Sequence, residues 1–132
     1  MTGNPDATVD EAAPRRCLVI EDNADAAESM ALLLRLSGHE AEMALDGSAG
    51  LETARRFCPD VVLCDIGLPG ELDGYGVARA FRADPDLCRA FLIALTGYGQ
   101  DEDRRRALDA GFDAHLTKPA DLDELKKLLA QA

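Results

Sequence analysis

Five residues that can take part in chemistry each follow a short apolar stretch of the chain. Glu21 and Asp22 follow the first stretch, and Asp65 follows the third. Thr96 follows the fourth stretch, and Lys118 follows the fifth. If these stretches are parallel strands, their carboxyl ends share one edge of a sheet, which is where such folds bind ligands. The sequence therefore predicts that these five side chains lie close together.

This set of residue types suits phosphoryl transfer to a carboxylate. Neighbouring carboxylates raise one another's pKa unless a cation lies among them, and Mg²⁺ prefers oxygen ligands. An aspartate can act as a nucleophile and form an aspartyl phosphate. A lysine and a bound cation neutralise the charge on the transferred group, as phosphoryl transfer requires. The spacing thus indicates a cation-assisted phosphoryl site.

Apolar stretches typical of buried strands alternate with segments of helical periodicity. Strands are predicted at residues 17–20, 39–45, 61–64, 91–95 and 113–117, and helices at 24–37, 50–58, 75–83, 101–110 and 121–130. Asp46 and Gly47 indicate a turn. This alternation predicts an α/β fold with a parallel sheet, helices on both faces and right-handed crossovers. The first, third and fourth strands are expected at the centre because they are uniformly apolar.

Four motifs lie at predicted strand ends. They are Ile20–Asn23, Val61–Gly70, Ala94–Tyr98 and Leu116–Pro119. Together they resemble the receiver domain of two-component response regulators, over residues 17 to about 129. Each motif is weak alone, but four in this order are specific. The resemblance implies a doubly wound (βα)5 fold with the flavodoxin-like strand order 2-1-3-4-5.

The resemblance implies a phosphoacceptor and a metal site. Asp65 would take a phosphoryl group from the phosphohistidine of a histidine kinase or of a histidine phosphotransfer protein. Glu21, Asp22, Asp65 and the backbone carbonyl of Gly67 would hold Mg²⁺, with Mn²⁺ as a substitute. The protein would be a phosphoacceptor in a phosphorelay rather than an enzyme.

The resemblance also implies a switch. Thr96 would donate its hydroxyl to the phosphoryl group, and Lys118 would pair with that group. The bond between Lys118 and Pro119 would be a cis peptide. Phosphorylation would bias an existing equilibrium and change a protein-binding surface formed by the predicted elements at 101–110, 113–117 and 121–130.

Three features depart from the family pattern, and a fourth residue, Tyr98, has two possible roles. Glu21 stands where the family often has aspartate, and its longer arm can reach a metal directly or through water. His115 occupies the position of an aromatic switch residue, but it is more often an ordinary core or surface histidine. Tyr98 either flanks the site or covers a loop. The loop at 70–74 is one residue longer than the common pattern.

Other readings of the same residues stay open. Asp65 could cap a strand end, and Lys118 could be a solvated loop residue. The chain could be a receiver cut from a hybrid histidine kinase. A metal-dependent phosphohydrolase with an aspartyl-phosphate intermediate is a further alternative, but Gly67 stands where such enzymes often carry a second aspartate. A flavin-binding module would need a hydroxyl-rich loop after residue 20, which is absent.

Composition limits the partners. The chain has 132 residues, 14 Lys and Arg and 25 Asp and Glu, which gives a net charge of −11. One domain is expected at this length. Phosphate contacts with nucleic acid need clustered basic residues, so nucleic acid is excluded as a partner, and an anionic membrane surface would repel the chain. Arg104–Arg106 lie among acidic residues and indicate a solvated helix face.

The rest of the sequence indicates a cytoplasmic protein. Residues 1–14 are small and polar and are expected to be a disordered leader, with the receiver domain at 15–132. No targeting signal or membrane-spanning stretch is present. The four cysteines, Cys17, Cys58, Cys64 and Cys88, show no CxxC pairing. They are expected to be buried free thiols in a reducing compartment.

Overall fold

Five parallel strands pair in the order β2-β1-β3-β4-β5. The strands are β1 (Arg16–Ile20), β2 (Glu40–Ala44), β3 (Val61–Asp65), β4 (Phe91–Thr96) and β5 (Ala114–Thr117). The computed structural model describes residues 14–97 and 101–132. Residues 1–13 of the expected leader and Tyr98 lie outside these ranges. The α/β class, the strand order and the central place of β1, β3 and β4 are confirmed.

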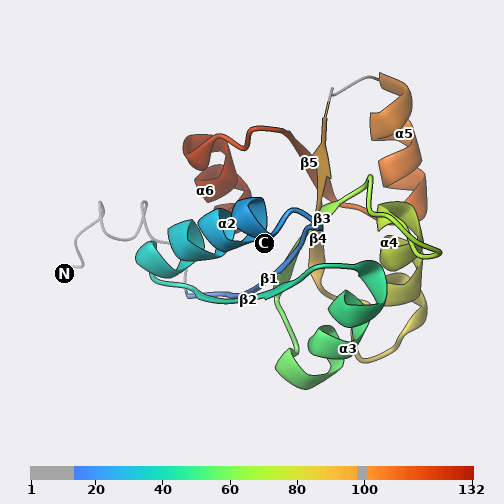
Figure 1. Cartoon of the computed structure of the whole chain (residues 1–132), viewed down its shortest axis with the longest axis horizontal. Coiled ribbons are helices and arrows are strands. Elements are labelled where there is room, and N and C mark those ends of the chain that lie inside the picture. The colour runs from blue at the N-terminus through green and yellow to red at the C-terminus, as the bar shows by residue number, and fades with distance from the viewer. Residues whose placement is uncertain (1–13, 98–100) are drawn as a thin grey trace.

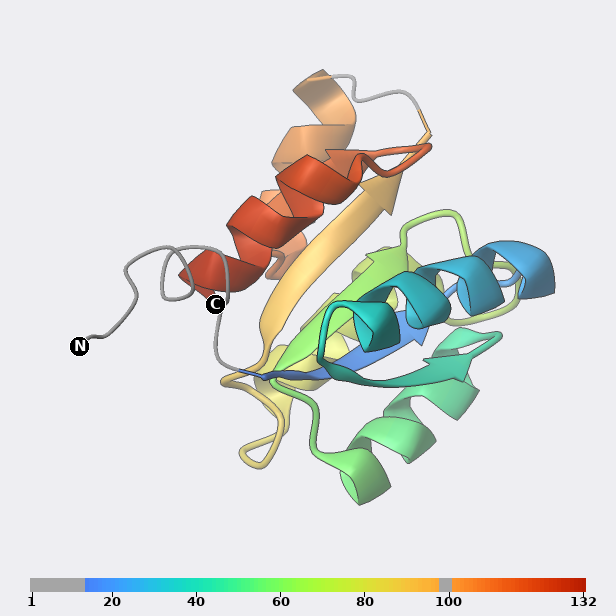
Figure 2. The same ribbon diagram turned by 90° about the vertical axis from the view of Figure 1, so that its left-hand side faces the viewer.

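Helices cover both faces of the sheet (Figures 1 and 2). They are α2 (Ala24–Leu36), α3 (Gly47–Phe57), α4 (Gly74–Ala83), α5 (Asp101–Ala110) and α6 (Leu122–Gln131). In Figure 1, α2 and α6 lie on one side of the sheet, and α3, α4 and α5 lie on the other. Among the described residues, none of these helices has the length and apolarity needed to cross a membrane.

Two apolar layers follow from the alternation of side chains along the strands. In β1, Leu18 and Ile20 pack with α3, α4 and α5, whereas Cys17 and Val19 pack with α2 and α6. All four side chains are fully buried. Because the central strands are buried on both faces, their sequences are continuous apolar runs. The same packing fixes the carboxyl ends of these strands at one edge of the sheet.

Helix α3 begins three residues earlier than the sequence pattern predicts. The sequence pattern predicts a turn at Asp46 and Gly47 and a helix that starts at Gly50. Instead, the Asp46 carboxylate accepts a hydrogen bond of 2.7 Å from the backbone N–H of Ala49 and caps the helix. An aspartate at this position satisfies a backbone donor that would otherwise lack a partner, so Gly47 becomes the first helical residue.

The cysteines differ in exposure, so the expectation that all four are buried is wrong. Cys17 and Cys64 are buried, Cys88 is half-buried and Cys58 is exposed. Cys58 ends α3 with a φ of 52°, a left-handed conformation at the surface. All four are free thiols. Burial, with a smaller contribution from the Asp60 charge, raises the pKa of the Cys17 thiol to about 12.

Candidate functional site

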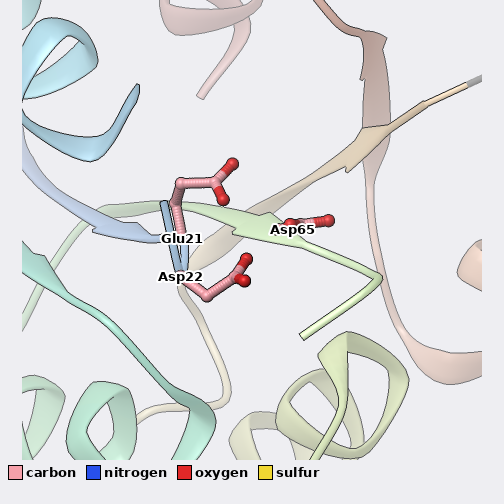
Figure 3. A group of neighbouring side chains, drawn as sticks. All are labelled: Glu21, Asp22 and Asp65. Atoms are coloured by element: carbon pink, nitrogen blue, oxygen red, sulfur yellow. The ribbon is translucent and has the colours of Figure 1, made fainter. Parts of the chain in front are cut away.

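Three carboxylates meet at the carboxyl ends of β1 and β3 (Figure 3). Each of Glu21, Asp22 and Asp65 offers one oxygen, and these oxygens all lie within 4.8 Å of one another. Glu21 and Asp65 are buried, whereas Asp22 is exposed. The strands bring them together because β1 and β3 are paired and parallel, with Ile20 opposite Cys64.

The turn from β1 into α2 fixes Glu21. Its backbone N–H donates to the carbonyl of Ala44 at 3.0 Å, which extends the pairing with β2 by one residue. Its Oε2 accepts a hydrogen bond of 3.0 Å from the backbone N–H of Asn23. Asn23 in turn caps α2 through its side chain. From the sequence, Asn23 is named only as part of the Ile20–Asn23 motif, and its contact with Glu21 is not predicted.

Lys118 joins the two buried carboxylates. Its Nζ lies 2.7 Å from Glu21 Oε1 and 3.0 Å from Asp65 Oδ2. Burial lowers the pKa of Lys118, but hydrogen bonds and charge interactions with Glu21 and Asp65 outweigh burial, so the pKa lies above its ordinary value. Lys118 is therefore held as an ammonium ion between two carboxylates.

The chain around Lys118 is fixed by the adjacent strand. The Lys118 backbone N–H donates to the carbonyl of Thr96 at 2.7 Å, and the Lys118–Pro119 peptide bond is cis. Thr96 and Thr117 are opposite each other in the β4–β5 pair. Lys118 thus directly follows the last paired residue of β5 and sits at the same edge as the carboxylates.

The loop after β3 orients Asp65. Asp65 Oδ1 accepts a hydrogen bond of 2.9 Å from the backbone N–H of Gly67. Gly74, the first residue of α4, returns against this loop so closely that an added Cβ would lie 2.3 Å from Ile66 Cα. Only a glycine permits that approach. The sequence predicts a loop at 70–74 but does not indicate this contact.

Thr96 and His115 lie on the same face of neighbouring strands. His115 is opposite Ala94, and side chains two residues apart in a strand share a face. Thr96 is fully buried, and in the described part of the chain its hydroxyl has no hydrogen-bond partner. His115 is half-buried. Its pKa is lowered, first by burial and then by the Arg104 charge, against an opposing effect of Glu124.

The cluster fits a hard divalent cation. Its three candidate ligands are all carboxylate oxygens, which are the donors that Mg²⁺ prefers. Asp22 has no hydrogen bond or ion pair to any other residue in the described ranges, so its carboxylate is available. The backbone carbonyl of Gly67 lies in the loop that contacts Asp65. A carboxylate nucleophile, a cation site and a fixed ammonium group together can support attack on phosphorus and neutralise the transferred charge.

The fold and the acidic edge of the sheet define a class of proteins. These are the doubly wound α/β proteins with an acidic site at the carboxyl ends of the strands. Within that class, the family of response regulator receiver domains matches residues 17–130. The chain belongs to this family and is a receiver domain of two-component signal transduction.

Individual relatives agree with this assignment. The chain is 32% identical over 110 residues to the DNA-binding dual master transcriptional regulator RpaA of Synechocystis, covering 83% of this chain and 45% of RpaA. It is 33% identical to an uncharacterized 14.6 kDa protein of Leptolyngbya boryana, covering 86% of each. The chain spans less than half the length of the first curated relatives that it matches.

A solved structure is also similar. The receiver domain of sensor histidine kinase PA1611 from Pseudomonas aeruginosa is 34% identical, with a TM-score of 0.80, over 90% of this chain and 97% of that chain. That structure has a magnesium ion coordinated in its active-site cleft. The acidic cluster of Glu21, Asp22 and Asp65 occupies the active-site position of the receiver fold.

Proposed function

We propose that Asp65 accepts a phosphoryl group from a phosphohistidine of a histidine kinase or of a histidine phosphotransfer protein. The observation that carries the proposal is the arrangement around Asp65. Two other carboxylates lie within 4.8 Å of it, and the Lys118 ammonium lies 3.0 Å from its Oδ2. A receiver fold with this arrangement has a nucleophile and its charge-stabilising groups in one place.

The transfer is a displacement at phosphorus. A carboxylate oxygen of Asp65 forms a bond to phosphorus while the phosphorus–nitrogen bond to the donor histidine breaks. The electron pair of that bond stays on the imidazole, which takes up a proton from solvent. The hydrogen bond from Gly67 to Asp65 Oδ1 leaves Oδ2 on the side of Lys118. The ammonium group is therefore placed to neutralise the phosphoryl oxygens as transfer proceeds.

Glu21, Asp22, Asp65 and the Gly67 carbonyl would hold the metal. Bound Mg²⁺, or Mn²⁺ in its place, would polarise the phosphoryl oxygens and neutralise charge. Asp22 is the exposed member of the set and the one without a protein partner in the described ranges. Glu21 is already bonded to Lys118 and Asn23. Asp65 is the member shared by the metal and the phosphoryl group.

Thr96 would report the phosphorylated state to a distant surface. Its buried hydroxyl lacks a hydrogen-bond partner among the described residues, and a phosphoryl oxygen is a strong acceptor. A shift of Thr96 toward that acceptor would change the packing beside His115 on β5. The surface of α5, β5 and α6 would then bind a downstream protein in one state and not in the other. No contact with nucleic acid or a membrane is proposed for this domain.

Labelling with acetyl phosphate tests the proposal. Intact-protein mass should show one phosphoryl adduct that requires Mg²⁺ and is absent from the Asp65→Asn variant. An adduct that persists in Asp65→Asn, or that forms equally in EDTA, would contradict the assigned acceptor or the metal. Turnover as a phosphohydrolase is disfavoured because Gly67 has no side chain to act as a second acid or base.

The receiver is proposed to act in the cytoplasm, either alone or as part of a longer protein. The similarity to the PA1611 receiver favours a hybrid histidine kinase as the second candidate. The two cases differ in the phosphodonor. Phosphate should reach Asp65 from a kinase segment encoded in the same gene in a hybrid, and from a separate protein otherwise.

A further inference from the structure

The loop between β3 and α4, residues 66–73, carries Gly67 and is fixed at both ends. The Gly74 N–H donates to the Ile66 carbonyl at 3.3 Å, which closes the loop at its base. Asp73 caps α4 by accepting a hydrogen bond of 2.9 Å from the Gly76 N–H. Near Gly67, the side chain of Leu68 is buried in the apolar layer beneath α4. These contacts fix Ile66, Leu68 and Asp73. Other contacts must therefore fix the part of the loop at residues 69–72, called here the far side.

Leu72 holds the far side of the loop between two helices. A Cβ on Gly47, in α3, would lie 2.6 Å from the Leu72 carbonyl oxygen, 3.0 Å from Val77 Cγ2 of α4 and 3.1 Å from Leu72 Cβ. A Cβ on Gly76, in α4, would lie 2.8 Å from Leu72 Cδ1. Real Cβ atoms essentially never come within 3.0 Å of such neighbours, so the 2.6 Å and 2.8 Å approaches require glycine. Gly47 and Gly76 therefore form a notch, called here the glycine notch, that receives Leu72.

Residues 69–71 of the loop border an open cavity rather than packed side chains. A cavity of about 380 Å³ lies between the loop and the start of α3, lined by Asp46, Gly47, Ser48, Pro69, Gly70, Glu71 and Leu72. Pro69, Gly70 and Glu71 are exposed. Because an open cavity supplies no packing atoms, the position of this part of the loop depends on Leu72 in the glycine notch on one side and on Leu68 on the other.

We propose that the glycine notch positions the loop that presents Gly67, and that Leu72 and Gly47 thereby set the metal affinity of the site. This inference rests on the proposed function, in which the Gly67 carbonyl is a metal ligand. Gly67 also donates to Asp65 Oδ1 at 2.9 Å, so a displaced loop would move a ligand and release the acceptor carboxylate together. Leu72 and Gly47 are positioning residues, because neither contacts the metal-binding carboxylates.

Two variants disturb the notch in opposite ways. Gly47→Ala places a methyl group against the Leu72 backbone, which cannot rotate away as a side chain could, so the loop and α3 must move apart. Leu72→Ala removes the Cδ1 that approaches Gly76 and keeps the carbonyl oxygen and Cβ that face Gly47, so it loosens the loop on the α4 side of the notch. If Gly47→Ala does not fold, Leu72→Ala still tests the proposal.

Gly111→Ala is the matched control. Gly111 has a φ of 119°, and a Cβ there would lie 2.7 Å from Arg82 Cγ. This variant is expected to destabilise the fold as Gly47→Ala does, but Gly111 follows α5 and lies outside the loop. If Mg²⁺ affinity falls only because the fold is less stable, it should therefore fall in Gly111→Ala as well.

The measurement is the Mg²⁺ Kd of each folded protein, by titration with MgCl₂ alone and detection by backbone NMR, with folding checked by circular dichroism. Groups that orient a metal ligand typically contribute about 10-fold or more to affinity, so we expect Kd to rise by about that factor in Gly47→Ala and Leu72→Ala. Gly111→Ala should bind as the wild type does.

Equal Kd values for wild type, Gly47→Ala and Leu72→Ala would overturn the role of the notch while leaving the metal site intact. A similar loss in Gly111→Ala would also overturn it, because the effect would then reflect stability alone. A wild-type protein that does not bind Mg²⁺ would instead contradict the proposed function on which this inference rests.

Discussion

Lys118 is the residue on which the electrostatics of the site depend. It lies within 3.0 Å of one oxygen on each of the two buried carboxylates, Glu21 and Asp65. Two carboxylates without this ammonium group would be poorly solvated and would repel each other. Lys118 is therefore the counter-ion of both carboxylates.

The raised pKa of Lys118 predicts a stability effect at alkaline pH. Because the folded-state pKa lies above the ordinary value of 10.5, the folded protein holds this proton more tightly than the unfolded chain does. The stabilisation is present below that value and is lost as pH rises through the folded-state pKa. Urea unfolding should show wild type more stable than Lys118→Met at about pH 8, with a smaller difference at about pH 11. A difference that does not change with pH would contradict this explanation.

Thr96 carries a buried hydroxyl without a partner in the described structure. A buried unpaired polar group costs free energy, so we expect Thr96→Val to keep or raise the free energy of unfolding, by about 1 kcal/mol. Thr117→Val is the control, because Thr117 is opposite Thr96 but exposed. Its effect should stay within about 0.5 kcal/mol. A clear loss of stability in Thr96→Val would mean that the hydroxyl has a partner.

At the scale of elements, α3 depends on its cap. Asp46 accepts the Ala49 N–H at 2.7 Å, and loss of such a cap typically costs about 1 kcal/mol. Asp46→Ala should lower the free energy of unfolding in urea by about that amount. Ser48→Ala, at an exposed position in the same turn, should have a much smaller effect. Equal losses in the two variants would show that Asp46 acts through something other than its capping bond.

The strands and helices could be predicted from sequence because their signals are local. The apolar runs 17–20, 61–64 and 91–95 mark the central strands, and the residues that follow these runs mark the edge that carries the site. The start of α3 could not be predicted because aspartate followed by glycine is common both in turns and at helix N-termini. Only the structure shows that Asp46 caps a helix here.

Contacts between elements could not be predicted in the same way. The 2.7 Å contact from Lys118 to Glu21 depends on side-chain rotamers that reach across the two strands, β3 and β4, between β1 and β5. The approach of Gly47 to Leu72 depends on how closely α3 packs against a loop 25 positions further along the chain. Cys58 is exposed because it lies at the C-terminal end of α3. The sequence around Cys58 did not indicate this exposure.

At the scale of the whole molecule, a bound cation should stabilise the fold. The proposed Mg²⁺ site is the cluster of three carboxylates, which the unfolded chain does not assemble. At a concentration of about 100 times Kd, Mg²⁺ should raise the free energy of unfolding by about 2.7 kcal/mol. Thermal unfolding should shift upward in MgCl₂ but not in NaCl at equal ionic strength.

Asp22→Asn provides the matched control for this shift. Asp22 is exposed and has no partner among the described residues, so its loss should leave the metal-free protein as stable as the wild type. The shift in MgCl₂ should then largely disappear. A full shift in Asp22→Asn would mean that the cation binds elsewhere on this acidic chain.

The central claim is that Asp65 receives phosphate from a phosphorus–nitrogen bond. The most direct measurement uses phosphoramidate, a small donor with that bond, in the presence of Mg²⁺. Borohydride reduction then converts an aspartyl phosphate to homoserine, which tandem mass spectrometry locates in the sequence. The account predicts homoserine at position 65 in the wild type and none in Asp65→Asn. Homoserine at another aspartate, or no modification in protein shown to bind Mg²⁺, would contradict it.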